Sequence, residues 1–226
     1  MIDYSIRLVR LRIKLTREER NLVSVTFRNV VGMRRASLRT LYTIEKAELD
    51  KENIKEVKIV RKAIEEATNE LTDYCTTIIH LVDDDIMKND QSLETQVFVM
   101  KMKADYYRYL AEAYRGSKHA EYSRKSLSSY EEAMEQAKAL SVASPLSLSV
   151  TLNYCVFQYE VLNDVTTALT VARRTFDSAT SELDTLSEES YHDANLVIQI
   201  LRTNITLWSS APDEHQEQDN NNSKID

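Results

Sequence analysis

The chain has very few of the residues that usually turn a β-structure. Its 226 residues include only two glycines, Gly32 and Gly116, and two prolines, Pro145 and Pro212. Strands that are joined by hairpins need such residues at most of their turns. This scarcity argues against a sandwich or a barrel and predicts an all-α protein.

Other features are also absent. The two cysteines, Cys75 and Cys155, lie far apart, which is typical of free, buried thiols in a reducing compartment. No apolar run approaches the roughly 20 residues of a membrane span. Charges interrupt the apolar start of the chain, so it does not resemble a signal peptide. The four histidines show no metal-type spacing and no partnered nucleophile. We therefore expect no metal, no cofactor and no enzymatic activity.

The formal net charge is −7, and it is unevenly distributed. Residues 212–226 hold five acidic side chains and one lysine, which leaves −3 for the rest of the chain. This polar segment lacks periodicity, so we predict a disordered acidic tail over residues 211–226. The acidic balance also argues against nucleic-acid binding.

Capping signals divide the chain into helices. Thr16 and Glu19 form a capping-box pattern, and Pro145 follows Ser144 in the arrangement typical of a helix start. Together with apolar periodicity they predict seven long antiparallel helices over residues 17–46, 54–87, 93–115, 118–140, 145–162, 166–183 and 188–209. The segment "RLRIKL" alternates apolar and charged residues, so we interpret residues 1–15 as an atypical segment containing a strand, outside a helical domain of residues 16–210.

A basic stripe stands out in this acidic chain. Arg28, Arg35 and Arg39 are spaced i, i+7 and i+11, which places them within about 40° of one another on a helix. Lys101 and Arg108 repeat the i, i+7 spacing on a later helix. Such stripes are usually solvated faces. If they converge, however, they favour a dianionic phosphate, whose oxygens suit the guanidinium fork.

Other faces supply an apolar wall for a concave groove, although apolar stripes of this kind usually pack into a core. The hypothesis assigns five apolar residues to this wall: Leu152, Val156, Val197, Ile200 and Trp208. Asn153 and Asn204 would bind the backbone of an extended peptide. Tyr109 would donate its hydroxyl group to the phosphate, and Glu160 would hold an arginine in place.

Four segments carry a resemblance to a known family: "NVVGMRRASLR", "KMKADYYRYLAE", "LNYCVFQYEVLN" and "DTLSEESYHDANLVIQILRTNITLW". They resemble the 14-3-3 proteins over about residues 15–210. The resemblance implies an adaptor that regulates signalling clients by binding their phosphoserine or phosphothreonine segments in an amphipathic groove. It also implies a cytoplasmic location and leaves a nuclear one open.

By matching motifs, the resemblance gives roles to individual residues. The phosphate-binding pair falls on Arg35 and Arg108, with Tyr109 completing the pocket. The groove lysines fall on Arg28 and Lys101. The same matching places the peptide-binding asparagines on Asn153 and Asn204 and the supporting acid on Glu160.

The start of the chain departs from the family. The family's first helix is absent and residues 1–14 do not resemble its second, although both helices normally contribute to the homodimer interface. Ala63 and Glu66 also replace an interfacial tyrosine and lysine. The resemblance therefore argues against a stable homodimer and leaves open a heterodimer with a full-length relative. Ser37, in "RRAS", resembles a site for basophilic kinases and is a candidate regulatory phosphosite.

One alternative from another class stays open at this point. Tyr114, Tyr130 and Ala133 are loosely echoed by Tyr159, Phe176 and Ala179 at a period of about 45 residues. This echo would suit a tetratricopeptide-like scaffold that binds unphosphorylated partners. The dependence of binding on phosphate distinguishes the two hypotheses.

Overall fold

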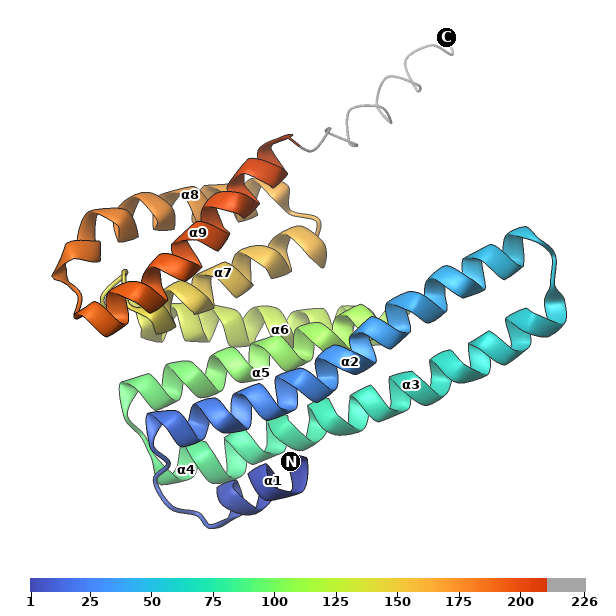
Figure 1. Ribbon diagram of the computed structural model, residues 1–226, viewed down its shortest axis with the longest axis horizontal. Coiled ribbons are helices and arrows are strands. Elements are labelled where there is room, and N and C mark those ends of the chain that lie inside the picture. The colour runs from blue at the N-terminus through green and yellow to red at the C-terminus, as the bar shows by residue number, and fades with distance from the viewer. Residues whose placement is uncertain (211–226) are drawn as a thin grey trace, which may run out of the picture.

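The computed structural model describes residues 1–210, and this part of the chain is an antiparallel array of helices without a strand (Figure 1). The predicted all-α class with seven long helices is confirmed. The long helices are α2 (Arg17–Asp50), α3 (Ile54–Leu81), α5 (Leu93–Ala113), α6 (Gly116–Ala137), α7 (Pro145–Glu160), α8 (Val165–Glu182) and α9 (Glu188–Ser210). Their bounds agree with the predicted ones within about one helical turn, except that α3 ends at Leu81, six residues before the predicted end at residue 87. The predicted acidic tail, residues 211–226, lies outside the described residues.

Side-chain caps fix where several of these helices begin. At the start of α2, Thr16 Oγ1 accepts a hydrogen bond from the Glu19 amide (3.2 Å), and Glu19 Oε2 accepts one from the Thr16 amide (2.8 Å). Ser144 caps α7 by accepting from the amide of Ser147 at 3.2 Å. These bonds satisfy N–H groups that have no partner within the helix. The capping signals read from the sequence therefore place α2 and α7 correctly.

The strand predicted near the N-terminus is wrong, because this segment begins with the short helix α1 (Ile2–Arg10). Its apolar positions Ile2, Ile6 and Val9 follow a helical spacing, and Val9 is fully buried against α2 and α3. Only Arg10 of "RLRIKL" belongs to α1; residues 11–15 form an irregular connection to α2, in which Leu15 is buried and the other four are exposed. The helix follows the apolar spacing of residues 2–9, and the alternating residues 11–15 form neither helix nor strand.

Three shorter elements connect the long helices. A π-helical turn (Val82–Ile86) and α4 (Met87–Asn89) join α3 to α5, and a 3₁₀ turn (Leu183–Thr185) follows α8. The helix predicted over residues 93–115 ends two residues early. Helix α5 ends at Ala113, and Gly116 opens α6 with a φ of 62°, which glycine adopts without strain.

The helices pack around successive apolar cores. The first core joins α1, α2, α3 and α5, and another joins α7, α8 and α9. Helices α5 and α6 lie between the long α2–α3 hairpin and the C-terminal helices, and smaller clusters connect them to α7 (Figure 1). This order places one face of α2 and α5 opposite α7 and α9.

Both cysteines are buried and free, as the sequence predicted. Burial raises the pKa of the Cys155 thiol to about 12. None of the helices within residues 1–210 is both long and apolar enough to cross a membrane.

Candidate functional site

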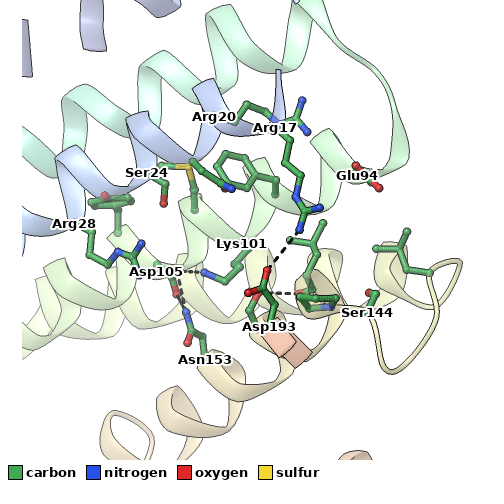
Figure 2. Close-up of a pocket in the computed structure, with 18 of the residues that line it drawn as sticks. Arg17, Arg20, Ser24, Arg28, Glu94, Lys101, Asp105, Ser144, Asn153 and Asp193 are labelled. Atoms are coloured by element: carbon green, nitrogen blue, oxygen red, sulfur yellow. Dashed lines mark hydrogen bonds and ion pairs between the residues drawn. The ribbon is translucent and has the colours of Figure 1, made fainter. Parts of the chain in front are cut away.

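A pocket of about 520 Å³ opens between α2, α5, α7 and α9 (Figure 2). Basic side chains from α2 and α5, including Arg28 and Lys101, line one side. Asn153 of α7 and Asp193 of α9 line the other. Arg17, at the start of α2, approaches Asp193 across the pocket at 4.0 Å. The helices therefore form a polar cleft, and its basic wall comes from the two helices that carry the predicted cations.

The carboxylate of Asp105 lines this pocket and binds side chains from three helices (Figure 2). Its carboxylate accepts hydrogen bonds from Lys101 Nζ at 2.8 Å, from the Tyr130 hydroxyl at 2.5 Å and from Asn153 Nδ2 at 2.8 and 3.0 Å. Burial alone would raise the pKa of Asp105, but the charges of Lys101 and Arg108 and these hydrogen bonds lower it. One ionised carboxylate thus connects side chains from α5, α6 and α7.

A second carboxylate, that of Glu112, connects two of the predicted phosphate ligands. Glu112 Oε2 accepts from Arg35 Nε at 2.8 Å and from Arg35 Nη2 at 2.6 Å. Glu112 Oε1 accepts from Arg108 Nη1 at 3.1 Å. Both guanidinium groups lie near the ring of Tyr109, with centroid distances of 4.2 and 4.7 Å. The structure therefore brings Arg35, Arg108 and Tyr109 together, although they belong to two helices.

Burial and the neighbouring charged and polar groups together set the protonation states of this cluster. Arg108 is almost fully buried and donates through Nε to the Tyr130 hydroxyl at 3.2 Å. Burial opposes its charge, but the nearby Tyr130, Tyr109, Asp105 and Glu112 hold its pKa well above the ordinary value. Burial, followed by the Asp105 charge, raises the pKa of the Tyr109 hydroxyl. Near neutral pH, Arg108 is therefore a cation and Tyr109 a neutral hydrogen-bond donor.

The two predicted groove cations differ in their partners. Lys101 is held by Asp105, whereas Arg28 has no ion pair within residues 1–210. Arg28 is exposed and lines the pocket from the α2 side. It is therefore available to an incoming anion without first breaking an internal contact.

None of the five residues of the predicted apolar wall lines either of the two pockets found within residues 1–210. On α9, Val197 is half-buried and Ile200 is 48% exposed, while Trp208 is 8% exposed. The Trp208 ring stacks on Tyr159 at 4.8 Å, so it belongs mainly to the C-terminal core. Asn204 and the α7 residues Leu152 and Val156 are half-buried.

Helical spacing connects this wall to the pocket. Asp193 lines the pocket, and Val197, Ile200 and Asn204 follow at i+4, i+7 and i+11 along the same face of α9. On α7, Asn153 lines the pocket, and Val156 and Glu160 follow at i+3 and i+7. The predicted residues thus continue the faces of α7 and α9 that line the pocket.

A second pocket, of about 360 Å³, shares the lining residue Tyr109 with the first. Arg35 and Glu112 line this pocket together with Glu160. Glu160 was expected to hold an arginine, but within residues 1–210 it forms no ion pair. The acid that holds both arginines is Glu112.

Three residues of the site were missed from the sequence: Asp105, Glu112 and Tyr130. Two of them had a local signal, because Lys101 with Asp105 and Arg108 with Glu112 are both i, i+4 pairs. Tyr130 comes from α6 and had no such signal. Ser37, the candidate phosphosite, is exposed on α2 and donates its hydroxyl hydrogen to the Met33 carbonyl at 3.1 Å.

Comparison with known proteins identifies the family. The family model described as "14-3-3 protein" matches residues 1–209. The chain belongs to the 14-3-3 family. It is 43% identical to 14-3-3 protein 7 of Solanum lycopersicum, over 95% of this chain and 85% of the relative. It is also 40% identical to 14-3-3 protein 2 of Entamoeba histolytica, over 93% of this chain and 88% of the relative.

The 14-3-3 match covers more of the chain than the motifs did, and it favours one hypothesis. It begins at residue 1, so it includes the N-terminal segment that was expected to lie outside the resemblance. The first helix of this 14-3-3 chain, α1, is therefore inside the matched region. Family membership also favours the phosphopeptide hypothesis over the tetratricopeptide-like scaffold.

Proposed function

We propose that the chain is a non-enzymatic adaptor that binds phosphoserine or phosphothreonine segments of signalling proteins in the cleft between α2, α5, α7 and α9. The observation that supports this most strongly is the cluster in which Arg35 and Arg108 flank Tyr109 and share the Glu112 carboxylate. The proposed setting is the cytoplasm, with a nuclear location left open, and the binding needs no metal or cofactor.

The cluster suits a dianionic phosphate for two physical reasons. The cluster holds three cations, Arg35, Arg108 and Lys101. Its two carboxylates, Glu112 and Asp105, leave one positive charge uncompensated, and Arg28 adds another in the same pocket as Arg108. The arginines are also held before a ligand arrives, Arg108 by Tyr130 and Arg35 by Glu112. Little side-chain entropy is then lost on binding. Each charge-assisted hydrogen bond contributes about 1.5–3 kcal/mol.

The peptide backbone would bind the asparagines on the facing helices. Asn153 donates its amide hydrogens to Asp105, which fixes the side chain and leaves its oxygen free to accept a peptide N–H. Asn204 would bind the peptide in the same way, further along α9. The half-buried Leu152, Val156 and Val197 and the exposed Ile200 would contact apolar side chains of the client.

The proposal is tested by fluorescence anisotropy with a labelled peptide that carries one phosphoserine among neutral residues. Arg35→Glu reverses a charge at the cluster and should abolish binding. Arg174→Glu, at an exposed position on α8, is the matched control and should bind as the unmodified chain does. Thermal unfolding of each variant separates loss of binding from loss of fold.

Charge reversal at Arg108 is a weaker test of phosphate binding, because Arg108 is buried and its replacement can disturb the fold. Arg28→Glu is a better second variant, since Arg28 is exposed and has no internal partner within residues 1–210. It should weaken binding without changing the melting temperature. If Arg35→Glu and Arg28→Glu both bind the phosphopeptide like the unmodified chain, the proposed site is wrong.

A further inference from the structure

The 360 Å³ pocket that shares Tyr109 with the first holds more positive charge than the phosphate cluster uses. Arg39, one turn beyond Arg35 on α2, and Arg115, in the connection between α5 and α6, both line it. Within residues 1–210, neither of these arginines forms an ion pair with a carboxylate, and both are exposed. Arg35, in contrast, is already compensated by Glu112.

Arg115 is held against α2 by an aromatic ring. Its guanidinium carbon lies 5.4 Å from the centre of the Tyr42 ring, within the range of a cation–π contact. The Tyr42 hydroxyl in turn donates to the Ala113 carbonyl at 3.3 Å. Because Arg39 and Tyr42 are three residues apart on α2, this contact brings Arg115 to the same helix face as Arg39.

The only carboxylate in the pocket that is not bound by an arginine within the described residues is Glu160. Arg39 and Arg115 together exceed its charge by one. Two guanidinium groups can donate to a carboxylate or a phosphate, whereas Glu160 forms an ion pair with neither arginine. The pocket therefore carries one positive charge more than its carboxylates neutralise, which favours the binding of an anion.

We propose that Arg39 and Arg115 form a second anion-binding subsite that takes an acidic group of the same client peptide. This inference rests on the proposed phosphopeptide function. Arg39 is about 6 Å beyond Arg35 along α2, at 1.5 Å per residue. An extended peptide covers about 6.6 Å in two residues and returns to the same face. The second anion therefore lies two positions from the phosphoserine, as a carboxylate side chain or a second phosphate.

The experiment compares four peptides by isothermal titration with the full chain. The reference carries one phosphoserine among neutral residues. Two others add glutamate two positions before or two positions after the phosphoserine, and the fourth carries a second phosphoserine at whichever of these positions binds more tightly. We expect one glutamate peptide to bind about 5- to 20-fold more tightly than the reference, and the doubly phosphorylated peptide to bind at least as tightly.

Three variants test whether the affinity advantage of the glutamate peptide comes from Arg39 and Arg115. Arg115→Gln should remove most of the glutamate advantage while leaving the affinity for the reference peptide unchanged. Arg39→Gln should also reduce this advantage. Glu160→Gln removes a competing negative charge, so it should increase the ratio between the glutamate and reference peptides. Arg174→Gln, at the exposed control position on α8, should leave every ratio unchanged.

Two results would overturn the inference alone. In one, neither glutamate peptide binds more tightly than the reference. In the other, the advantage persists in both Arg115→Gln and Arg39→Gln. If the reference phosphopeptide itself does not bind the unmodified chain, the proposed function fails, and the second subsite fails with it.

Discussion

The guanidinium groups of Arg35 and Arg108 bind opposite oxygens of one carboxylate, that of Glu112. They come from α2 and α5, and the ring of Tyr109 lies beside both. Two cations that would otherwise repel each other are thus held together next to the cleft. This arrangement explains how the protein keeps these two cations in a fixed geometry before any ligand binds.

The first prediction concerns Glu112. Glu112→Gln removes the shared negative charge and leaves Arg108 buried without full compensation. The ligand-free variant should lose about 1–3 kcal/mol of unfolding free energy, measured by urea denaturation. Glu65→Gln, an exposed position on α3, is the matched control and should change stability by less than about 0.5 kcal/mol. Equal stability of the two variants would contradict the bridging role of Glu112.

The second prediction concerns the pH dependence of phosphopeptide binding. The second ionisation of a phosphoserine lies near pH 6, so the dianion is replaced by a monoanion on acidification. Affinity should fall by up to about tenfold between pH 7 and pH 5 if the dianion is the bound form. No histidine lines either pocket, and the lowered pKa of Asp105 keeps that carboxylate ionised over this range. A flat affinity profile by isothermal titration would contradict phosphate recognition.

The third prediction concerns acid stability. The pKa of Asp105 in the folded protein is below the ordinary value of 3.8. Its stabilising contribution is therefore fully present above about pH 4 and is lost as the pH falls through the folded-state pKa. Asp105→Asn should cost about 3 kcal/mol at pH 7.

The measurement is urea unfolding of both proteins from pH 7 down to pH 2. The difference in stability between the unmodified chain and Asp105→Asn should shrink in the acidic part of this range. Asp177→Asn, at an exposed position on α8, controls for the general titration of surface carboxylates. A difference that stays constant from pH 7 to pH 2 would show that the Asp105 charge does not stabilise the fold.

Local signals in the sequence were sufficient for most of the fold. The Thr16–Glu19 capping box and the Ser144–Pro145 pair placed the starts of α2 and α7, because caps act within one turn. The strand prediction near the N-terminus failed because a strand needs a partner strand, and residues 1–210 contain none; the burial of Val9 on α1 depends on α2 and α3. A window of a few residues does not contain that information.

The candidate site was only partly predictable for the same reason. Helical spacing and the resemblance both indicated Arg35 and Arg108, but the choice of Glu160 as their supporting acid does not match the ion pairs that form. Glu112 holds both arginines because α2 and α5 pack side by side, a tertiary arrangement that spacing on one helix cannot show. The bond of Tyr130 to Asp105 likewise connects two helices.

The fourth prediction concerns assembly, which no contact within residues 1–210 tests. We expect a polypeptide of these 226 residues to be predominantly monomeric at micromolar concentration. Glu66 pairs with Lys62 on α3 at 3.8 Å, where the resemblance places an interfacial lysine. Exposed Leu22 and Met33 on α2 form apolar surface that favours aggregation instead. Light scattering that gives a dimer mass at low micromolar concentration would refute the monomer prediction.

Ser37 stays a candidate phosphosite on the same helix. Its exposed position on α2 makes the hydroxyl accessible, and phosphorylation would add up to about two negative charges there. Ser37→Asp should weaken a heterodimer with another 14-3-3 chain in sedimentation experiments. Ser37→Ala is the matched control and should leave it unchanged. Equal association of both variants would refute a regulatory role for this residue.

The central claim is that the cleft recognises phosphate, and isothermal titration with twin peptides tests it most directly. The two peptides share one sequence and differ only in the phosphate on a single serine. Two or three charge-assisted hydrogen bonds to Arg35, Arg108 and Tyr109 predict that the phosphorylated twin binds about 10²- to 10⁴-fold more tightly. Equal affinities for the two peptides would contradict the account.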